Sequence, residues 1–236
     1  MERIITFTAD DLGLNEETNL AIEHAHRHGA LNAASLMMGQ QGTAHALEIV
    51  RRNPDLQIGC HFHACDSTPL TRPRWPWGNS PARAGLALAL WPSARRLVRA
   101  ELQAQWDQIS AAGVNCRFVN GHHHLHIHPF IAREMRRGIA SSFTGWVRGF
   151  NVRFFDDRRR PHFQFLRHRA AHWLNDWPAN RRTDTLWGLD RLFRMNADEV
   201  RRALADLPEG RHEFLFHPRR ENDADQTALV ELMQST

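Results

Sequence analysis

Five histidines stand within seven residues of this chain, in the run NGHHHLHIHP at 120–129. Imidazole is the commonest ligand for borderline-soft metal ions, so we expect one of these side chains to bind a metal. Residues 116–119, just before the run, have the apolar pattern of a short buried strand. The histidines therefore begin where a strand ends, the place where α/β folds carry their chemistry. This internal position argues against a purification tag or an adventitious surface tract.

Two other predicted strands also end in polar side chains. The alternating run of residues 3–8 ends at Asp10 and Asp11, and residues 56–60 lead into His61. One carboxylate with two imidazoles makes a metal site that leaves positions open for water and substrate. Because successive strand residues point to opposite faces, we expect Asp10 and Asp11 to have different roles. Taken alone, a pair of acids more often caps a helix, and a single histidine more often packs in the core. The prediction of a metal site therefore depends on finding these residues together at several strand ends.

Size and composition indicate one globular domain. The 236 residues are 42% hydrophobic, enough for one large core, and we interpret residues 1–236 as a single domain. No stretch approaches the roughly 20 apolar residues of a membrane span, and the chain begins with a strand instead of a signal peptide. We therefore expect a cytoplasmic protein. Three cysteines argue against a disulfide framework, and we expect Cys60 to point away from His61 and to be structural.

The charge pattern gives no sign of a nucleic-acid partner. All 30 basic residues are arginine, which a nucleotide-composition bias explains, and the net charge is only +4. No recognition helix, zinc finger or RNA-binding aromatic motif accompanies this charge. We expect no nucleic-acid partner, and the sequence leaves the oligomeric state open.

Strand-like and helix-like segments alternate along the chain, which favours a parallel sheet with helical crossovers. The expected strands are residues 3–8, 32–38, 56–60, 116–119, 152–155, 183–187 and 213–216. The expected helices are residues 15–28, 44–52, 93–112, a helix from 129, 162–175 and 196–207. We expect Gly29 to end the first helix, Pro129 to begin the fourth, and Asn196 to cap the last. The final strand ends at His217, a fourth reactive strand end.

In their order along the chain, five motifs resemble the YdjC-like carbohydrate deacetylases. They are Thr8-Ala-Asp-Asp-Leu-Gly13, Gly29 with Ala34-Ser-Leu-Met-Met38, Gly59-Cys-His-Phe62, His122-His-His-Leu-His126 with Pro129, and Phe216-His217-Pro218. The resemblance covers nearly the whole chain. Within that family, residues 33–37, 128–129, 184–189 and 207–210 are most similar to the hopanoid-biosynthesis-associated branch known as HpnK.

The resemblance implies a single (β/α) barrel, TIM-like but distorted from eightfold regularity, with its active site at the carboxyl ends of the strands. It implies one divalent metal ion held by Asp11, His61 and His122. It further implies that Asp10 is the general base and that His217 is the catalytic acid. Two imidazoles and a carboxylate suit Zn²⁺, and the family also allows Mg²⁺.

The choice of ligand within the histidine run stays open. Strand alternation would place His122, His124 and His126 on one side if the strand continued. The family motif favours His122, with His126 second. Asn120 stands where the family often has aspartate, so we expect it to affect how the run is oriented.

The implied activity is removal of acetate from an N-acetylamino sugar of the N-acetylglucosamine type. The sugar would be carried on a hopanoid or another lipid, or presented as a soluble chitooligosaccharide. A metal-dependent phosphoesterase or another amidohydrolase is the enzymatic alternative, because Asp and His at barrel strand ends serve those reactions too. Metal storage by the histidine run is a third hypothesis, and it would need neither Asp10 nor His217.

Two segments are candidates for choosing the substrate. Trp75, Trp77 and the apolar residues 86–91 follow the strand that ends at His61, where tryptophan faces can stack on a sugar or meet a lipid. Ordinary packing is the alternative for this segment. Residues 146–182 interleave arginine with aromatic residues, a pattern found in segments that dock on anionic membranes and in solvated helices with aromatic core residues. Docking predicts peripheral contact with the inner membrane face.

Overall fold

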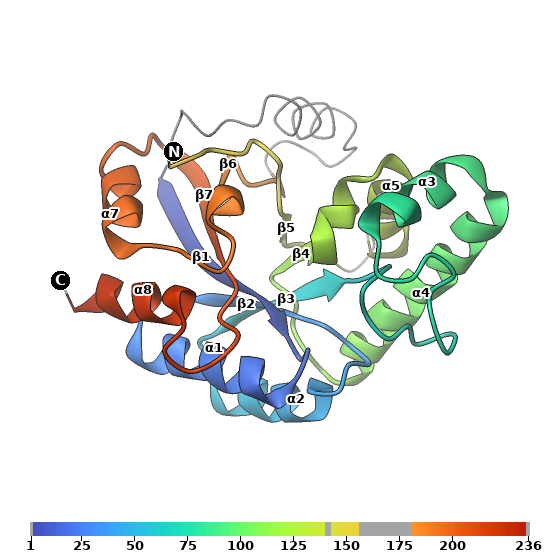
Figure 1. Cartoon of the computed structure of the whole chain (residues 1–236), viewed down its shortest axis with the longest axis horizontal. Helices are drawn as coiled ribbons and strands as arrows, with labels where there is room; N and C mark the ends of the chain where they lie inside the picture. Colours follow the sequence, from blue (N-terminus) through green and yellow to red (C-terminus); the bar gives the residue numbers. More distant parts are fainter. Residues whose placement is uncertain (1, 140–142, 156–180, 235–236) are drawn as a thin grey trace.

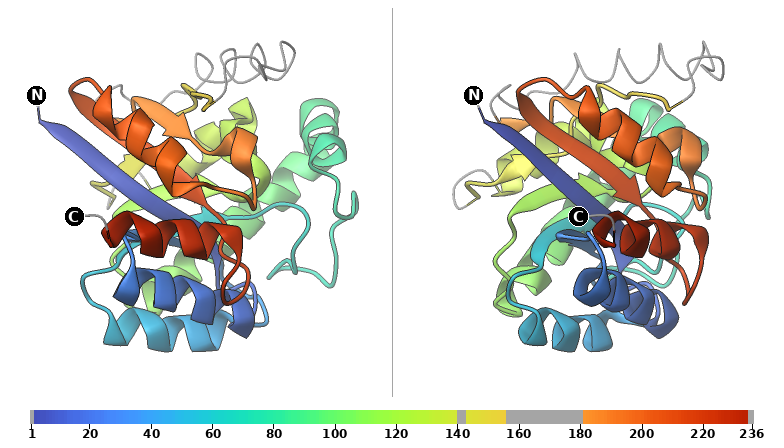
Figure 2. Two further views of the ribbon diagram at one scale, coloured as in Figure 1. Left: turned by 60° about the vertical axis from the view of Figure 1, so that its left-hand side comes forward. Right: turned by 90° about the vertical axis from the view of Figure 1, so that its left-hand side faces the viewer.

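Figure 1 shows the computed structural model of the chain, in which residues 2–139, 143–155 and 181–234 are described. Seven parallel strands form one sheet in the spatial order β5-β4-β3-β2-β1-β7-β6. The strands are β1 (Arg3–Leu12), β2 (Ala33–Leu36), β3 (Gln57–Phe62), β4 (Phe118–Gly121), β5 (Trp146–Val147), β6 (Thr185–Trp187) and β7 (Gly210–Phe216). The sheet is curled, and the helices pack along its outer side (Figures 1 and 2).

The helices alternate with these strands. The α-helices are α1 (Glu16–His28), α2 (Thr43–Arg52), α3 (Pro81–Leu90), α4 (Pro92–Ala111), α5 (Pro129–Ile139), α7 (Ala197–Ala205) and α8 (Ala224–Met233). Two 3₁₀ helices, η1 (His122–Ile127) and η4 (Leu189–Arg191), follow β4 and β6. Within the described part of the chain, no helix has the length and apolar content to cross a bilayer.

The central position of β1 explains how distant side chains meet. β1 lies between β2 and β7, and it pairs with β7 in register from Arg3 opposite Gly210 to Ala9 opposite Phe216. Parallel neighbours end at the same edge of a sheet, so the carboxyl ends of β1, β2, β3, β4 and β7 converge. All the side chains of the candidate site lie at or next to this edge.

The sheet forms a curled half-barrel rather than a regular eight-stranded TIM barrel. Its two outer strands, β5 and β6, do not pair directly. Each outer strand instead makes one isolated bridge to the segment next to the other: Val147 of β5 with Arg182, which precedes β6, and Leu186 of β6 with Val152, which follows β5. In the described ranges, the predicted strand at 152–155 is therefore wrong apart from the single bridge at Val152. The predicted helix at 162–175 lies outside the described residues.

Three predicted helix boundaries are confirmed. Pro129 begins α5, and the Asn196 side chain caps α7 by accepting hydrogen bonds from two backbone N–H groups. Gly29 ends α1 as expected, but its backbone is extended and not left-handed. Glycine is required there by close packing, because a Cβ would lie 2.8 Å from the carbonyl oxygen of Leu229 in α8.

Among the described residues, two α-helices and one strand were not expected from the sequence. α3 begins at Pro81 behind the Ser80 cap, and α8 begins behind the Asp223 cap, so both carry ordinary start signals. The two-residue strand β5 is too short to show any periodicity.

Both segments that were candidates for choosing the substrate contribute buried side chains to the core. Trp75 and Trp77 are buried and stack on each other at 5.6 Å between ring centroids, so the packing alternative holds for them. Trp146 is also buried and stacks on Phe118 at 4.6 Å. These three aromatic side chains therefore stabilise the core and do not form a docking surface.

Candidate active site

Both acids of the pair at the end of β1 face the site, contrary to strand alternation. Asp11 has a φ of 70°, a left-handed conformation that is uncommon for a residue with a side chain. The pairing of β1 with β2 also shifts register between Ala9 and Leu12. This irregularity turns the Asp11 carboxylate to the same side as Asp10. Backbone strain of this kind, of about 1–3 kcal/mol, concentrates at functional sites.

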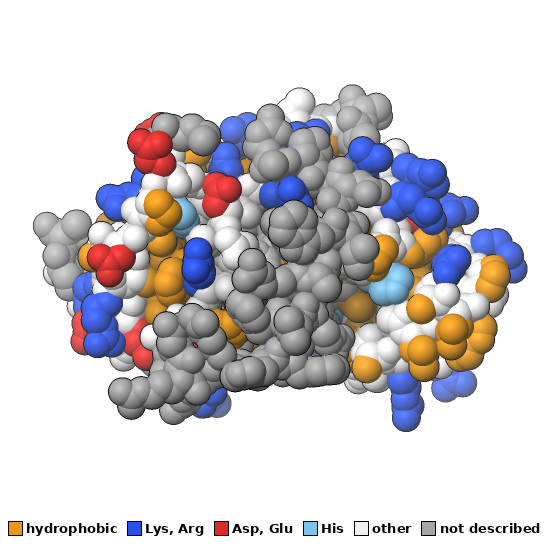
Figure 3. Space-filling model, turned by 90° about the horizontal axis from the view of Figure 1, so that it is seen from above, with side chains coloured by type: hydrophobic (Ala, Val, Ile, Leu, Met, Phe, Trp, Pro, Cys, Tyr) orange, Lys and Arg blue, Asp and Glu red, His pale blue; other side chains and the backbone are white. Residues whose placement is uncertain are grey.

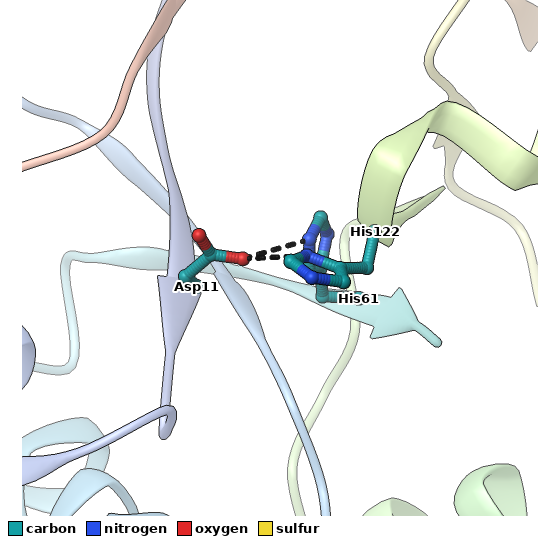
Figure 4. A group of neighbouring side chains, drawn as sticks. All are labelled: Asp11, His61 and His122. Carbon is teal, nitrogen blue, oxygen red and sulfur yellow. Dashed lines mark hydrogen bonds and ion pairs between the residues drawn. The ribbon is translucent and has the colours of Figure 1, made fainter. Parts of the chain in front are cut away.

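Asp11, His61 and His122 form a compact buried group (Figure 4). Asp11 Oδ1 lies 3.3 Å from His61 Nε2 and 3.0 Å from His122 Nδ1. Burial raises the pKa of Asp11, but hydrogen bonds from His122 and His61 outweigh it and hold the pKa well below its usual value. The three side chains come from the ends of β1, β3 and β4, as the convergence of parallel strands requires.

The hydrogen bonds around His61 show that this group is suited to a cation. Asn120 Nδ2 donates to Asp10, so its Oδ1 faces His61 Nδ1 at 2.6 Å and accepts a hydrogen bond from the Nδ1–H group. The Nε2 atom of a neutral His61 then presents a lone pair to the Asp11 carboxylate. Two facing acceptors are stable only with a proton or a metal ion between them. Burial lowers the pKa of His61, but the charges of Asp10 and Asp11 raise it above the usual value, which reflects the same attraction for a cation.

The donor set fits a divalent metal ion. A carboxylate and two imidazoles, all within 4.8 Å of one another, are the ligands that Zn²⁺ accepts while keeping positions open. A second group shares His122 and adds Asp66 and His123, whose Oδ2 and Nε2 atoms lie 2.9 Å apart. The side chains of this second pair are partly exposed, 35% for His123 and 41% for Asp66. The residues that could hold a metal in the buried position are therefore Asp11, His61 and His122.

The histidine run does not continue as a strand. It forms η1, in which His123 and His124 have left-handed φ values of 49° and 56°. The condition for alternation, a continuing strand, is therefore not met, and strand alternation does not apply to these histidines. His126 lies away from the metal-ligand group, with Nε2 donating to the Arg148 carbonyl at 3.2 Å. Burial lowers the pKa of His126 to about 3, so this side chain is neutral at physiological pH.

Arg148 lies beside the site and was not singled out by the sequence. It is fully buried and donates to both Asp10 oxygens, at 2.6 and 2.9 Å. It also donates twice to Glu213 Oε1. The sequence analysis grouped Arg148 with arginines of a stretch that either docks on a membrane or forms a solvated helix face. Neither alternative holds for Arg148, because its side chain lies inside the half-barrel beside the site. Its exposed fraction is 0%, and Arg191 is the other buried arginine among the described residues, at 8%.

The donors around Asp10 keep it ionised. Burial alone would raise the pKa of Asp10, but the Arg148 and His61 charges hold the pKa far below its usual value. Ser35 Oγ adds a hydrogen bond to Asp10 Oδ1 at 2.6 Å. His217 Nε2 lies 3.9 Å from Asp10 Oδ2. Burial also lowers the pKa of His217 to about 4, against the opposing Asp10 charge, so the resting pair is a carboxylate beside a neutral imidazole.

Asn120 and Arg219 complete the surroundings of the two acids. Asn120 forms hydrogen bonds with both His61 and Asp10. We expected it to orient the histidine run, but its side chain forms no hydrogen bond with that run. It orients the His61 ring instead. Arg219 Nη2 donates to Asp11 Oδ2 at 2.9 Å and leaves Oδ1 to the two histidines. The sequence offered one signal for Arg219, its position two residues after His217.

Replacing Arg148 with methionine is expected to lower the free energy of unfolding by about 3–5 kcal/mol. Two buried carboxylates would lose the charge that compensates them. Because the folded pKa of Asp10 lies below the unfolded value, this stabilisation is present above about pH 4 and declines as the pH falls. Urea unfolding followed by circular dichroism measures the change. The exposed Arg153→Met is the control and should change stability by less than about 0.5 kcal/mol. A loss below about 1 kcal/mol in Arg148→Met would contradict the expectation.

Comparison with known proteins gives related sequences over most of the chain. The model of the family described as YdjC-like protein matches residues 4–235. A carbohydrate deacetylase of Vibrio campbellii (strain ATCC BAA-1116) is 30% identical over 163 residues, which are 67% of this chain and 64% of the relative. One of Brevibacillus brevis (strain 47 / JCM 6285 / NBRC 100599) is 33% identical over 125 residues, 52% of this chain and 50% of the relative. The chain thus matches between half and two thirds of the length of these two curated relatives.

A solved structure shares the fold. The "putative cellobiose-phosphate cleavage protein" from Enterococcus faecalis V583 has a TM-score of 0.64 at 15% sequence identity, and the match covers 100% of this chain and 92% of that chain. At this identity the likeness concerns the fold alone. The sequence match over residues 4–235 carries the assignment. By that match, the chain belongs to the YdjC-like protein family.

Proposed function

We propose that this protein is a metal-dependent hydrolase that removes acetate from an N-acetylamino sugar of the N-acetylglucosamine type. The observation that carries the proposal is the arrangement of Asp11, His61 and His122 as a metal-ligand group directly beside Asp10 and His217. Two relatives that match this chain are named carbohydrate deacetylases, which supports the reaction class.

The proposed metal ion, Zn²⁺ or Mg²⁺, would be held by Asp11, His61 and His122. When bound, it would polarise the acetamide carbonyl and lower the pKa of a water molecule toward about 7. Arg219 holds the second oxygen of Asp11, and Asn120 orients His61. These contacts fix the ligands before any ion binds, which favours one coordination geometry.

Asp10 and His217 would handle the proton. Asp10 is ionised at rest, so it can accept a proton from the attacking water, although the Arg148 charge makes it a weak base. His217 is neutral at rest and lies 3.9 Å from Asp10. The proton from water can pass through this pair to His217, and His217 can donate it to the departing sugar amine. One proton enters the pair and one leaves for the amine, while the second proton of the water stays on the acetyl product. The products are therefore a free amine and acetic acid, which ionises to acetate in solution.

A finer proposal is that the sugar is carried on a lipid such as a hopanoid, at the membrane surface facing the cytoplasm. It rests on the exposed side chains of Leu86, Leu90 and Trp91, each 56% to 60% exposed, where α3 meets α4. Arg83 and Arg96 are exposed on the same two helices. Figure 3 shows hydrophobic side chains gathered at this end of the molecule with arginines around them. Apolar residues flanked by cations are suited to the interface of an anionic bilayer.

Acetate release is the decisive assay for both levels of the proposal. We expect the zinc- or magnesium-loaded protein to release acetate from N-acetylglucosamine oligosaccharides or from an N-acetylglucosaminyl lipid in anionic vesicles. Mass spectrometry should show the loss of one acetyl group. Faster turnover of the lipid than of the soluble sugars supports the finer proposal.

Three outcomes would count against these proposals. Phosphate release from sugar phosphates without acetate release would favour a phosphoesterase. Equal or faster turnover of soluble chitooligosaccharides would reject the lipid and favour a soluble oligosaccharide deacetylase. Full activity in the presence of a strong chelator would reject the metal.

A further inference from the structure

Phe193 has an unusual backbone conformation next to the candidate site. It follows η4 and has a φ of 60°, a genuine outlier for a bulky aromatic residue. Its side chain is nevertheless 47% exposed, so core packing does not account for the conformation. A strained, exposed aromatic side chain beside a reactive centre indicates a role outside folding.

The Phe193 ring touches the side chains that surround both acids. Its centroid lies 5.4 Å from that of His217, in an edge-on arrangement with an interplanar angle of 66°. The Arg219 guanidinium carbon lies 4.9 Å from the same ring, in cation–π contact. Arg219 in turn donates to Asp11, and His217 lies beside Asp10. Phe193 is therefore separated by one side chain from each of the two acids, Asp10 and Asp11.

The segment that carries Phe193 is held firmly. Asp225 is fully buried, and its two oxygens accept hydrogen bonds from the backbone N–H groups of Met195 and His217. One carboxylate thus ties the Phe193 segment to the strand end that bears His217. On the other side, Arg191 forms a two-pronged ion pair with Glu199 of α7. The exposed ring is consequently presented by a rigid loop, as a binding surface requires.

We propose that Phe193 is the wall of the sugar subsite, against which the ring that bears the acetamido group stacks beside His217. The apolar face of a pyranose fits an exposed aromatic ring, and aromatic side chains dominate small-molecule sites. Stacking there places the sugar nitrogen next to the group that delivers its proton. Arg219, which is held by its hydrogen bond to Asp11, contacts the Phe193 ring and supports its position. The proposal rests on the proposed function, because it places the same substrate in the same site.

The test separates binding from reaction. The proteins are wild type, Phe193→Ala, Phe193→Trp and the control Leu192→Ala, whose side chain is 46% exposed on the same loop. Calorimetry measures the Kd for a glucosamine trisaccharide, a product that is not turned over. Acetate release from the N-acetylated trisaccharide gives KM and kcat, and thermal unfolding gives Tm.

We expect Phe193→Ala to raise both Kd and KM about tenfold and to change kcat less than about threefold. Phe193→Trp keeps an aromatic face and should raise Kd and KM less than Phe193→Ala does. Leu192→Ala should stay near wild type, and Tm should not fall in Phe193→Ala because no core contact is lost. Unchanged Kd and KM in Phe193→Ala, or a fall in kcat alone, would contradict the proposal that the sugar stacks on Phe193.

The proposed function can fail separately. If trisaccharide binding depends on Phe193 but wild type releases no acetate, the proposed reaction is rejected and the proposed stacking on Phe193 is retained. Acetate release with unaltered constants in Phe193→Ala would keep the reaction and reject the wall. Absence of any trisaccharide binding by wild type would reject the wall as well.

Discussion

Replacing His61 with alanine is expected to remove the metal and the activity together. His61 Nε2 faces Asp11 Oδ1 at 3.3 Å, and Asn120 holds the ring in the orientation that exposes this lone pair. Loss of a ligand should weaken metal binding by at least about 100-fold, since loss of a supporting partner alone costs 10- to 100-fold. His122→Ala should behave in the same way. Metal content after dialysis, measured by mass spectrometry, together with acetate release, checks both variants.

Two histidines serve as matched controls. His63 stands two residues after His61 and is equally buried, but its Nε2 donates to the Met38 carbonyl at 2.9 Å. His126 belongs to the same run as His122, and its Nε2 donates to the backbone carbonyl of Arg148. His63→Ala and His126→Ala should keep their metal. Full metal occupancy in His61→Ala and His122→Ala would reject the assigned ligand set, and metal loss in His126→Ala alone would favour His126 as the second imidazole.

The second large effect is expected at Asp10. Asp10→Asn should lower turnover by about 10²-fold or more while the metal stays bound, because the positioned base is lost and the ligands are not. His217→Ala should show a loss of the same order, because the relayed proton then has no donor to the amine. Steady-state kinetics and metal analysis on the same samples measure both effects. Retained activity in either variant would reject the proposed proton path.

A control is needed because Asp10 also neutralises the buried charge of Arg148. Glu213→Gln removes the other carboxylate that pairs with Arg148 and leaves Asp10 intact. If the loss in Asp10→Asn came only from an uncompensated Arg148, Glu213→Gln should lose turnover to a similar extent. We expect Glu213→Gln to lower stability and to keep most of its turnover. Equal losses in the two variants would assign Asp10 a structural role instead.

The sequence by itself determined the alternating α/β pattern and the strand ends that carry Asp10, Asp11, His61 and His217. These follow from local chemistry, because hydrophobic periodicity, caps and prolines act within a few residues. Parallel neighbours end at one edge, so the ends of the strands were bound to converge. Elements without a local signal were missed, such as the two-residue β5, and α3 and α8 were missed although their caps were readable.

Only the tertiary structure decided how these side chains face one another. Alternation assumes a regular strand. The left-handed backbone at Asp11 turns its side chain against the predicted direction, and His123 lies in a 3₁₀ helix where alternation does not apply. Arg148 meets Asp10 across 138 residues of sequence, and nothing local marks it among the arginines. The physical reason is that curvature of the sheet and burial are set by all the strands together. A side chain's surroundings, and therefore its charge and its role, arise only when distant segments pack against it.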